Sequence, residues 1–163
     1  MVRFCGQERC LIDANGRVRL PPRLAAAFQP TGPDVMLHVL PEGALGVFPV
    51  PAWDTIGTLD DATVRRTLTD VRTRRTLRRL GAWSSPEVLS NQGRLTIPHA
   101  FREVLGLVPG AEVVVTGCGI GVEIWAAPRW ETEMGLLADH ELRRNDALMA
   151  ADLRTTNDGG GPA

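Results

Sequence analysis

The sequence predicts an α+β fold, mainly β, made of two tandem β-β-α-β-β repeats that are joined by a helical linker. The first observation is that DANGRVRLP, which begins at Asp13, is followed 77 residues later by the similar SNQGRLTIP, which begins at Ser90. The same shift aligns residues 13–59 with residues 90–136 without a gap. The second observation is that both copies have glycine and proline at equivalent positions, where these residues mark turns and the ends of strands. A unit of about 47 residues cannot bury a core alone, so we expect the two copies to pack together.

Each copy is expected to begin with a β-hairpin. In the first copy, residues 11–12 and 18–20 flank Asn15-Gly16. Asn-Gly readily adopts the positive φ values that a type I′ turn requires. The second copy has Gln-Gly at the same place, which is a weaker turn signal.

A short helix is expected after the hairpin in each copy. Pro21 and Pro98 end the second strand and suit the first turn of a helix, because the φ of proline is fixed near the helical value. Gly106 then closes the second helix. Two more strands follow in each copy, and another helix begins near Pro51 or Pro128. These strands are expected at residues 35–40 and 45–48, and at residues 112–116 and 122–125.

The chain is expected to have four segments. They are the first repeat with its following short helix (1–59), an arginine-rich helical linker (60–82), the second repeat with a C-terminal helix (83–144) and a disordered tail (145–163). Thr73, Leu77 and Leu80 share one face of the linker helix. The linker arginines could form a DNA-binding surface or a solvated face with ion pairs to the acidic C-terminal half. We favour the solvated face.

The formal net charge of −1 conceals a segregation of charge along the chain. Residues 1–30 sum to +3 and residues 61–82 to +5, whereas residues 109–163 sum to −5. The chain contains arginine but no lysine. A near-neutral total therefore does not exclude a nucleic-acid partner.

Several classes of protein are not indicated by the sequence. No apolar run approaches the ~18 residues that span a bilayer, and the start MVRFCGQERC lacks the apolar core of a signal peptide, so we expect a cytoplasmic protein. The three cysteines form no C-x-x-C pair. No histidine is spaced with cysteines or carboxylates as in a metal site or a catalytic triad. We therefore expect no enzyme activity, no cofactor and no small-molecule substrate.

The doubled motif resembles the MraZ family. The resemblance rests on two G-R-x-x-x-P motifs, the P-x-W-[DE] that follows each of them, the arginine-rich linker and GVEIWAAPRW near the end. Each half of that family is a SpoVT/AbrB-like swapped-hairpin domain, so the resemblance implies an intramolecular pseudo-dimer. It further implies a bacterial, nucleoid-associated transcriptional regulator that binds DNA upstream of the division and cell-wall gene cluster, with its protomers assembled in a ring.

Arg17 and Arg94 are the main candidates for contacts with DNA bases. Each directly follows a turn glycine, Gly16 or Gly93, and so projects from a stiff, protruding loop. The arginine fork can donate two hydrogen bonds to guanine in the major groove, which supplies ~1–3 kcal/mol of base discrimination. The other candidates are Asn15 and Arg19 beside Arg17, and Arg3, Arg23 and Arg102 as phosphate contacts.

Two residues depart from the family pattern, and they predict that the halves bind DNA unequally. Asp13 can accept a backbone N–H two residues further on and can orient Arg17. Its counterpart Ser90 can accept such a backbone N–H only more weakly, and it can hardly orient Arg94. The helix arginine that the second copy keeps as Arg102 is Ala25 in the first copy.

Three functions remain open from the sequence. We favour a sequence-specific transcriptional regulator over an AbrB-type antitoxin or transition-state regulator, and over a ring-forming assembly protein that has lost specific DNA binding. Because one protomer offers at most two loops and has a formal net charge of −1, which gives little nonspecific attraction to DNA, we expect several protomers to bind together. The operator should then contain direct repeats about 10 bp apart.

Overall fold

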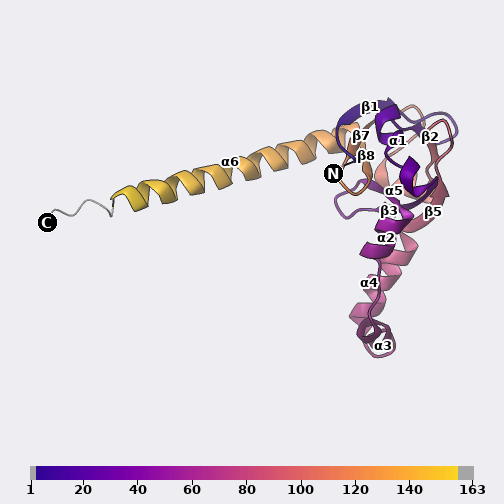
Figure 1. Cartoon of the computed structure of the whole chain (residues 1–163), viewed down its shortest axis with the longest axis horizontal. Helices are drawn as coiled ribbons and strands as arrows, with labels where there is room; N and C mark the ends of the chain where they lie inside the picture. The colour runs from indigo at the N-terminus through magenta and orange to yellow at the C-terminus, as the bar shows by residue number, and fades with distance from the viewer. Residues whose placement is uncertain (1–2, 158–163) are drawn as a thin grey trace. The chain divides into compact units, whose positions relative to one another are not determined.

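The computed structural model describes residues 3–157, with side chains up to residue 154 (Figure 1). Within the described residues, 3–127 belong to one compact unit and 128–157 to a second, and each is described by itself. The first copy contributes β1 (Gln7–Leu11), β2 (Arg17–Arg19), α1 (Pro22–Ala26), the 3-10 turn η1 (Gln29–Thr31), β3 (Asp34–Val39), β4 (Leu45–Pro49) and α2 (Val50–Ile56). The second copy contributes β5 (Ser84–Val88), β6 (Arg94–Thr96), α5 (His99–Leu105), β7 (Glu112–Gly117) and β8 (Val122–Ala126). The predicted α+β class is confirmed, and its sheets are antiparallel.

The larger sheet interleaves strands of the two copies. Its six strands are all antiparallel to their neighbours and have the order β1-β7-β8-β4-β3-β5. The first strand of each copy therefore lies beside the third strand of the other copy, and β4 pairs with β8 at the centre. Exchanging the two copies reverses this order without changing it, which is the pattern of an internal two-fold arrangement.

The smaller sheet is a two-stranded ribbon formed by β2 and β6. Its inner face belongs to the core, because Val18 and Leu95 are fully buried there. Ile12, Leu20 and Ile97 are also buried beside it. Neither copy can bury these apolar side chains alone, so the core forms only when the two copies combine.

The predicted hairpin between residues 11–12 and 18–20 is only partly present. Ile12 and Val18 form an isolated antiparallel bridge. Beyond this bridge, however, β1 pairs with β7 and β2 pairs with β6. The prediction of a simple hairpin was wrong here because β2 pairs with β6 of the other copy, which buries Val18 and Leu95, whereas the largely exposed β1 pairs with β7.

The linker forms two helices, α3 (Asp61–Thr69) and α4 (Val71–Ala82), which contact each other (Figure 1). Asp70 separates them and has extended backbone dihedrals. Its carboxylate accepts hydrogen bonds from the backbone N–H groups of Arg72 (3.0 Å) and Thr73 (3.1 Å), as an N-cap does. A new helix therefore begins directly after Asp70.

The C-terminal segment is more helical than the sequence suggested. Helix α6 (Ala127–Asn157) is 31 residues long, whereas disorder was predicted from residue 145. Alanine, leucine, methionine and arginine are frequent in residues 142–154, and their helix propensity outweighs the polar character of the segment. The rest of the predicted tail, residues 158–163, lies outside the described residues.

Candidate nucleic-acid interface

The outer face of the β2–β6 ribbon gathers three arginines from the two copies. Side chains alternate between the faces of a strand, so the burial of Val18 and Leu95 directs their neighbours outward. The outward side chains are Arg17 and Arg19 of β2, and Arg94 and Thr96 of β6. All are exposed except Arg17, which is half-buried. The ribbon is thus a basic surface that lies directly over the core.

The register of the ribbon brings these arginines close together. Arg19 lies directly opposite Arg94, and Arg17 lies opposite Thr96. Arg17 and Arg94 are therefore diagonal neighbours, with Cα atoms about 7–8 Å apart. Like charges that face each other across two strands are unfavourable on their own. A bound anion between these side chains would relieve that repulsion.

A tight turn at residues 13–17, here called the first loop, leads into β2. The amide of Gly16 donates to the carbonyl of Asp13 (3.0 Å), and Gly16 has a φ of +73°. Ala14 and Asn15 keep negative φ, because no described residue other than glycine has a positive value. The turn is therefore not the type I′ turn that the sequence predicted. Only Gly16 needs the left-handed conformation, as in three-residue hairpin loops.

Asp13 organises the first loop with both of its carboxylate oxygens. Oδ1 accepts the backbone N–H groups of Asn15 (2.8 Å) and Arg17 (2.9 Å). Oδ2 accepts Nε of Arg17 at 2.9 Å, which makes an ion pair. These hydrogen bonds, that from the Arg17 backbone first, lower the pKa of Asp13 below its usual value. The side chain of Arg17 is therefore held by Nε, and its two Nη groups are left for a ligand.

The corresponding turn at residues 90–94, the second loop, has the same backbone but fewer side-chain contacts. Gly93 also has a φ of +73°, and its amide donates to the carbonyl of Ser90 at 2.8 Å. The hydroxyl of Ser90 accepts the backbone N–H of Arg94 (3.0 Å). Within residues 3–157, no side chain accepts a hydrogen bond from the guanidinium of Arg94. The side chain of Arg94 is thus less constrained than that of Arg17.

Arg102 lies beneath the first loop, although it belongs to α5 of the second copy. Its Nε donates to the carbonyl of Ile97 at 3.0 Å, and its side chain is half-buried. A Cβ placed on Gly16 would lie 2.4 Å from Cζ of Arg102, so the guanidinium packs directly against this glycine. The sequence predicted a phosphate contact for Arg102, and that contact stays untested. The packing on Gly16 was missed, because no local sequence pattern signals a contact between copies.

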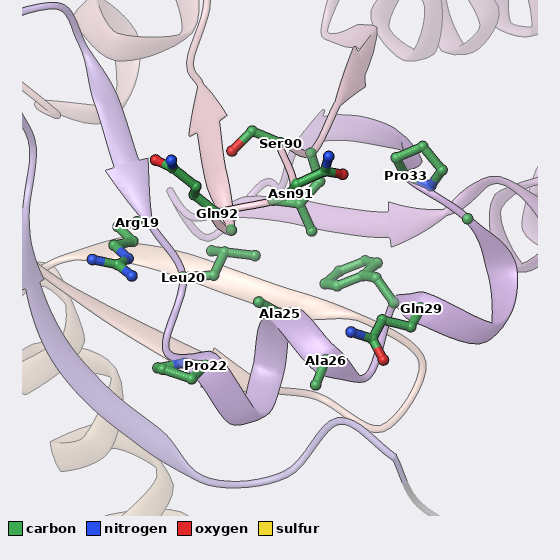
Figure 2. A pocket seen from close by; sticks show the side chains of 14 residues that line it. Arg19, Leu20, Pro22, Ala25, Ala26, Gln29, Pro33, Ser90, Asn91 and Gln92 are labelled. Carbon is green, nitrogen blue, oxygen red and sulfur yellow. The ribbon is translucent and has the colours of Figure 1, made fainter.

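A hollow lies beneath the second loop, where the first copy has Ala25 (Figure 2). Its volume is about 580 Å³. Figure 2 shows Ser90, Asn91 and Gln92 of the second loop on one side and Ala25 and Ala26 of α1 on the other. No side chain equivalent to Arg102 fills it.

The remaining predicted residues lie outside the ribbon. Asn15 is exposed at the tip of the first loop. Arg23 is exposed on α1, and one Nη lies 3.5 Å from Sγ of Cys5. Arg3 is exposed next to Phe4, which forms a bridge to Gly119. The structure thus brings Arg17, Arg19 and Arg94 together but does not place Arg3 or Arg23 on the same strands.

Two kinds of feature are absent from the described part of the chain. Between residues 3 and 157, no group of three or more His, Cys, Asp or Glu side chains is arranged to hold a metal ion. None of the described helices is both long and apolar enough to cross a membrane.

Comparison with known proteins gives a consistent result. Residues 89–152 match the family model described as "MraZ protein, putative antitoxin-like". A protein of Deinococcus radiodurans named transcriptional regulator MraZ is 33% identical over 127 residues, which are 77% of this chain and 83% of the relative. A protein of the same name from Solidesulfovibrio magneticus is 30% identical, over 91% of this chain and 95% of the relative. One from Thermus thermophilus is 32% identical, over 77% of this chain and 83% of the relative. With its doubled motif and a similarity that spans most of both chains, this protein belongs to the MraZ family.

Proposed function

We propose that this protein is a transcriptional regulator that binds specific DNA sequences through the β2–β6 ribbon. The observation that carries the proposal is the outer face of the ribbon, where Arg17, Arg19 and Arg94 converge while the inner face is buried. A two-stranded ribbon fits the major groove of B-DNA, which is about 12 Å wide. The names of the curated relatives support the same function.

Within this proposal, Arg17 and Arg94 contact base edges. Their positions beside the two loops and their diagonal spacing of about 7–8 Å allow both to enter one major groove. Each guanidinium can donate two hydrogen bonds to O6 and N7 of a guanine. Arg19 lies opposite Arg94 and supplies a further positive charge, and Asn15 at the tip of the first loop supplies an amide. Arg3 and Arg23 contact phosphates, which adds affinity without sequence preference.

Several protomers are proposed to bind one DNA at the same time. The whole chain has a formal charge of −1, so a single protomer gains little from nonspecific attraction. Protomers joined in a ring would raise the effective concentration of each loop near the DNA. Head-to-tail protomers present the same loop in the same direction, which suits direct repeats rather than a palindrome. By its family resemblance, the protein would act in the bacterial cytoplasm, at the nucleoid, upstream of the division and cell-wall gene cluster.

The proposal can be tested by comparing two basic surfaces of the same chain. Binding to DNA from upstream of the protein's own gene is measured by fluorescence anisotropy, with random DNA of the same length as reference. The double variant Arg19→Ala/Arg94→Ala should lose specific affinity by about tenfold or more. The control is Arg75→Ala/Arg78→Ala, which removes two exposed arginines from α4 of the linker. If the control loses specific binding and the ribbon variant keeps it, the interface is the linker and the proposal is wrong.

A further inference from the structure

The two loops are supported from below by different residues, and each support comes from the other copy. Under the first loop, Ile97 donates its amide to the carbonyl of Gly16 (3.1 Å), and its own carbonyl accepts Nε of Arg102 (3.0 Å). The Arg102 guanidinium then lies against Gly16, since a Cβ there would be 2.4 Å from Cζ and 2.6 Å from Nε. The second copy thus holds the first loop through a backbone hydrogen bond from Ile97 and through the side chain of Arg102.

Under the second loop only the backbone half of this arrangement is present. Leu20 donates its amide to the carbonyl of Gly93 at 2.8 Å, as Ile97 does to Gly16. The residue equivalent to Arg102 is Ala25, whose Cβ would lie 3.1 Å from a Cβ on Gly93. Beside it is the hollow of about 580 Å³ lined by residues of α1 and the second loop (Figure 2). A methyl group thus stands where the other half of the molecule has a guanidinium.

We propose that Arg102 is a positioning residue for the first loop, which it supports across the boundary between the copies, and that Ala25 leaves the second loop without this support. The first loop is then presented to a ligand in one conformation, and the second is free to adapt. Packing of the guanidinium against Gly16 restricts the turn that aims Arg17. An interaction that orders a contact residue before binding improves affinity, because less conformational freedom is lost in the complex. For DNA binding the inference rests on the function proposed above, whereas the difference in loop order does not.

This role differs from a phosphate contact in what a lysine at position 102 would do. A lysine keeps the positive charge and binds phosphate as a point charge, but it has no planar guanidinium to lie against Gly16. If Arg102 contacts a phosphate, Arg102→Lys should bind DNA nearly as well as the parent protein. If Arg102 positions the loop, Arg102→Lys should lose specific binding much as Arg102→Ala does. The salt dependence of the DNA affinity should then be the same in both variants as in the parent protein.

The first experiment uses the free, full-length protein and amide hydrogen exchange followed by NMR or mass spectrometry. Arg102→Ala should speed exchange at Gly16 and Arg17, whose amides are bonded to Asp13, and leave Gly93 and Arg94 unchanged. The converse variant Ala25→Arg places a guanidinium in the hollow and should slow exchange at Gly93 and Arg94. Equal changes in both loops, or no change in the first loop, would overturn the inference. Because no DNA is present, this result does not depend on the proposed function.

The second experiment measures specific and nonspecific DNA affinity for the same variants. Arg102→Ala and Arg102→Lys should each lower the ratio of specific to nonspecific affinity by about tenfold, with the nonspecific affinity unchanged. In the Ala25→Arg protein, the loss caused by Arg94→Ala should become larger than it is in the parent protein. An Arg102→Lys variant with full specific affinity would contradict the positioning role. If the parent protein itself shows no preference for its upstream DNA, the proposed function fails, while the exchange data still decide the loop inference.

Discussion

Replacing Gly16 by alanine should destabilise the protein more than the same change at Gly93, and the difference should report the contact with Arg102. Both glycines have a φ of +73°. An alanine in this left-handed region costs roughly 1–2 kcal/mol, and this cost is common to both sites. The surroundings differ, because the new Cβ at Gly16 meets the Arg102 guanidinium at 2.4–2.8 Å, whereas at Gly93 it meets the Cβ of Ala25 at 3.1 Å.

The expected magnitudes follow from what has to move. The end of the Arg102 side chain is flexible, so it would swing away from the new methyl group and lose its hydrogen bond to Ile97. The loss of such a bond costs about 0.5–1.5 kcal/mol. Gly16→Ala should therefore reduce the free energy of unfolding by roughly 2–3 kcal/mol. At Gly93 a shift of a few tenths of an ångström relieves the contact, so the loss should stay near 1–2 kcal/mol.

A double-mutant cycle measures this contact directly. Urea unfolding of the single variants is compared with that of Gly16→Ala/Arg102→Ala and Gly93→Ala/Arg102→Ala. All are measured at one protein concentration, because the proposed assembly of protomers would add to stability. The coupling energy should be about 1 kcal/mol between positions 16 and 102 and near zero between positions 93 and 102. Equal losses at the two glycines, or equal coupling to Arg102, would refute the assignment of the guanidinium to the first loop.

Four further outcomes are expected. Arg17→Ala should weaken specific binding by ~1–3 kcal/mol and more than Arg94→Ala does, since only Arg17 is oriented by a carboxylate; equal, nonspecific losses in a titration would contradict this. Ser90→Asp should raise specific affinity or leave it level, and a fall with an unchanged circular dichroism spectrum would place Ser90 near a phosphate. Inserting about half a helical turn between operator repeats should reduce affinity more than inserting a full turn, and a footprint indifferent to both would exclude phased protomers. Because the pKa of Asp13 is lowered from its usual 3.8, its support of the first loop should be complete above that pH and lost only as the pH falls through the lower folded value, which exchange at the Arg17 amide can follow.

The local structure of each repeat could be predicted because it depends on neighbouring residues. Pro98 precedes α5 and Gly106 ends it with a φ of +67°, as the helix signals indicated. The strands expected from residues 35–48 and 112–125 appear as β3, β4, β7 and β8. Even in the second copy, where Gln92-Gly93 is a weaker turn signal, Gly93 has the left-handed conformation. Steric limits on φ act within a few residues, so they are visible in the sequence.

The errors of local prediction had local causes as well. The type I′ turn was expected from Asn15-Gly16, but the Asp13 carboxylate accepts the amide of Asn15 and stabilises a turn in which only Gly16 has a positive φ. Asp70 was not recognised as a helix N-cap, so the break between the two helices of the linker was not predicted. In both places a side-chain carboxylate bonded to backbone amides decided the conformation.

By itself, the sequence determined the duplicated unit, its strands and helices, the glycines of the two loops and the arginines that follow them. Only the tertiary structure decided which strands pair, because the fully buried Val18 lies where β2 pairs with β6 of the other copy. That pairing places Arg94 opposite Arg19 and brings Arg102 under Gly16. It also leaves a hollow above Ala25. These contacts join residues far apart in the chain, and they depend on the burial of one shared core, which no local pattern of residues encodes.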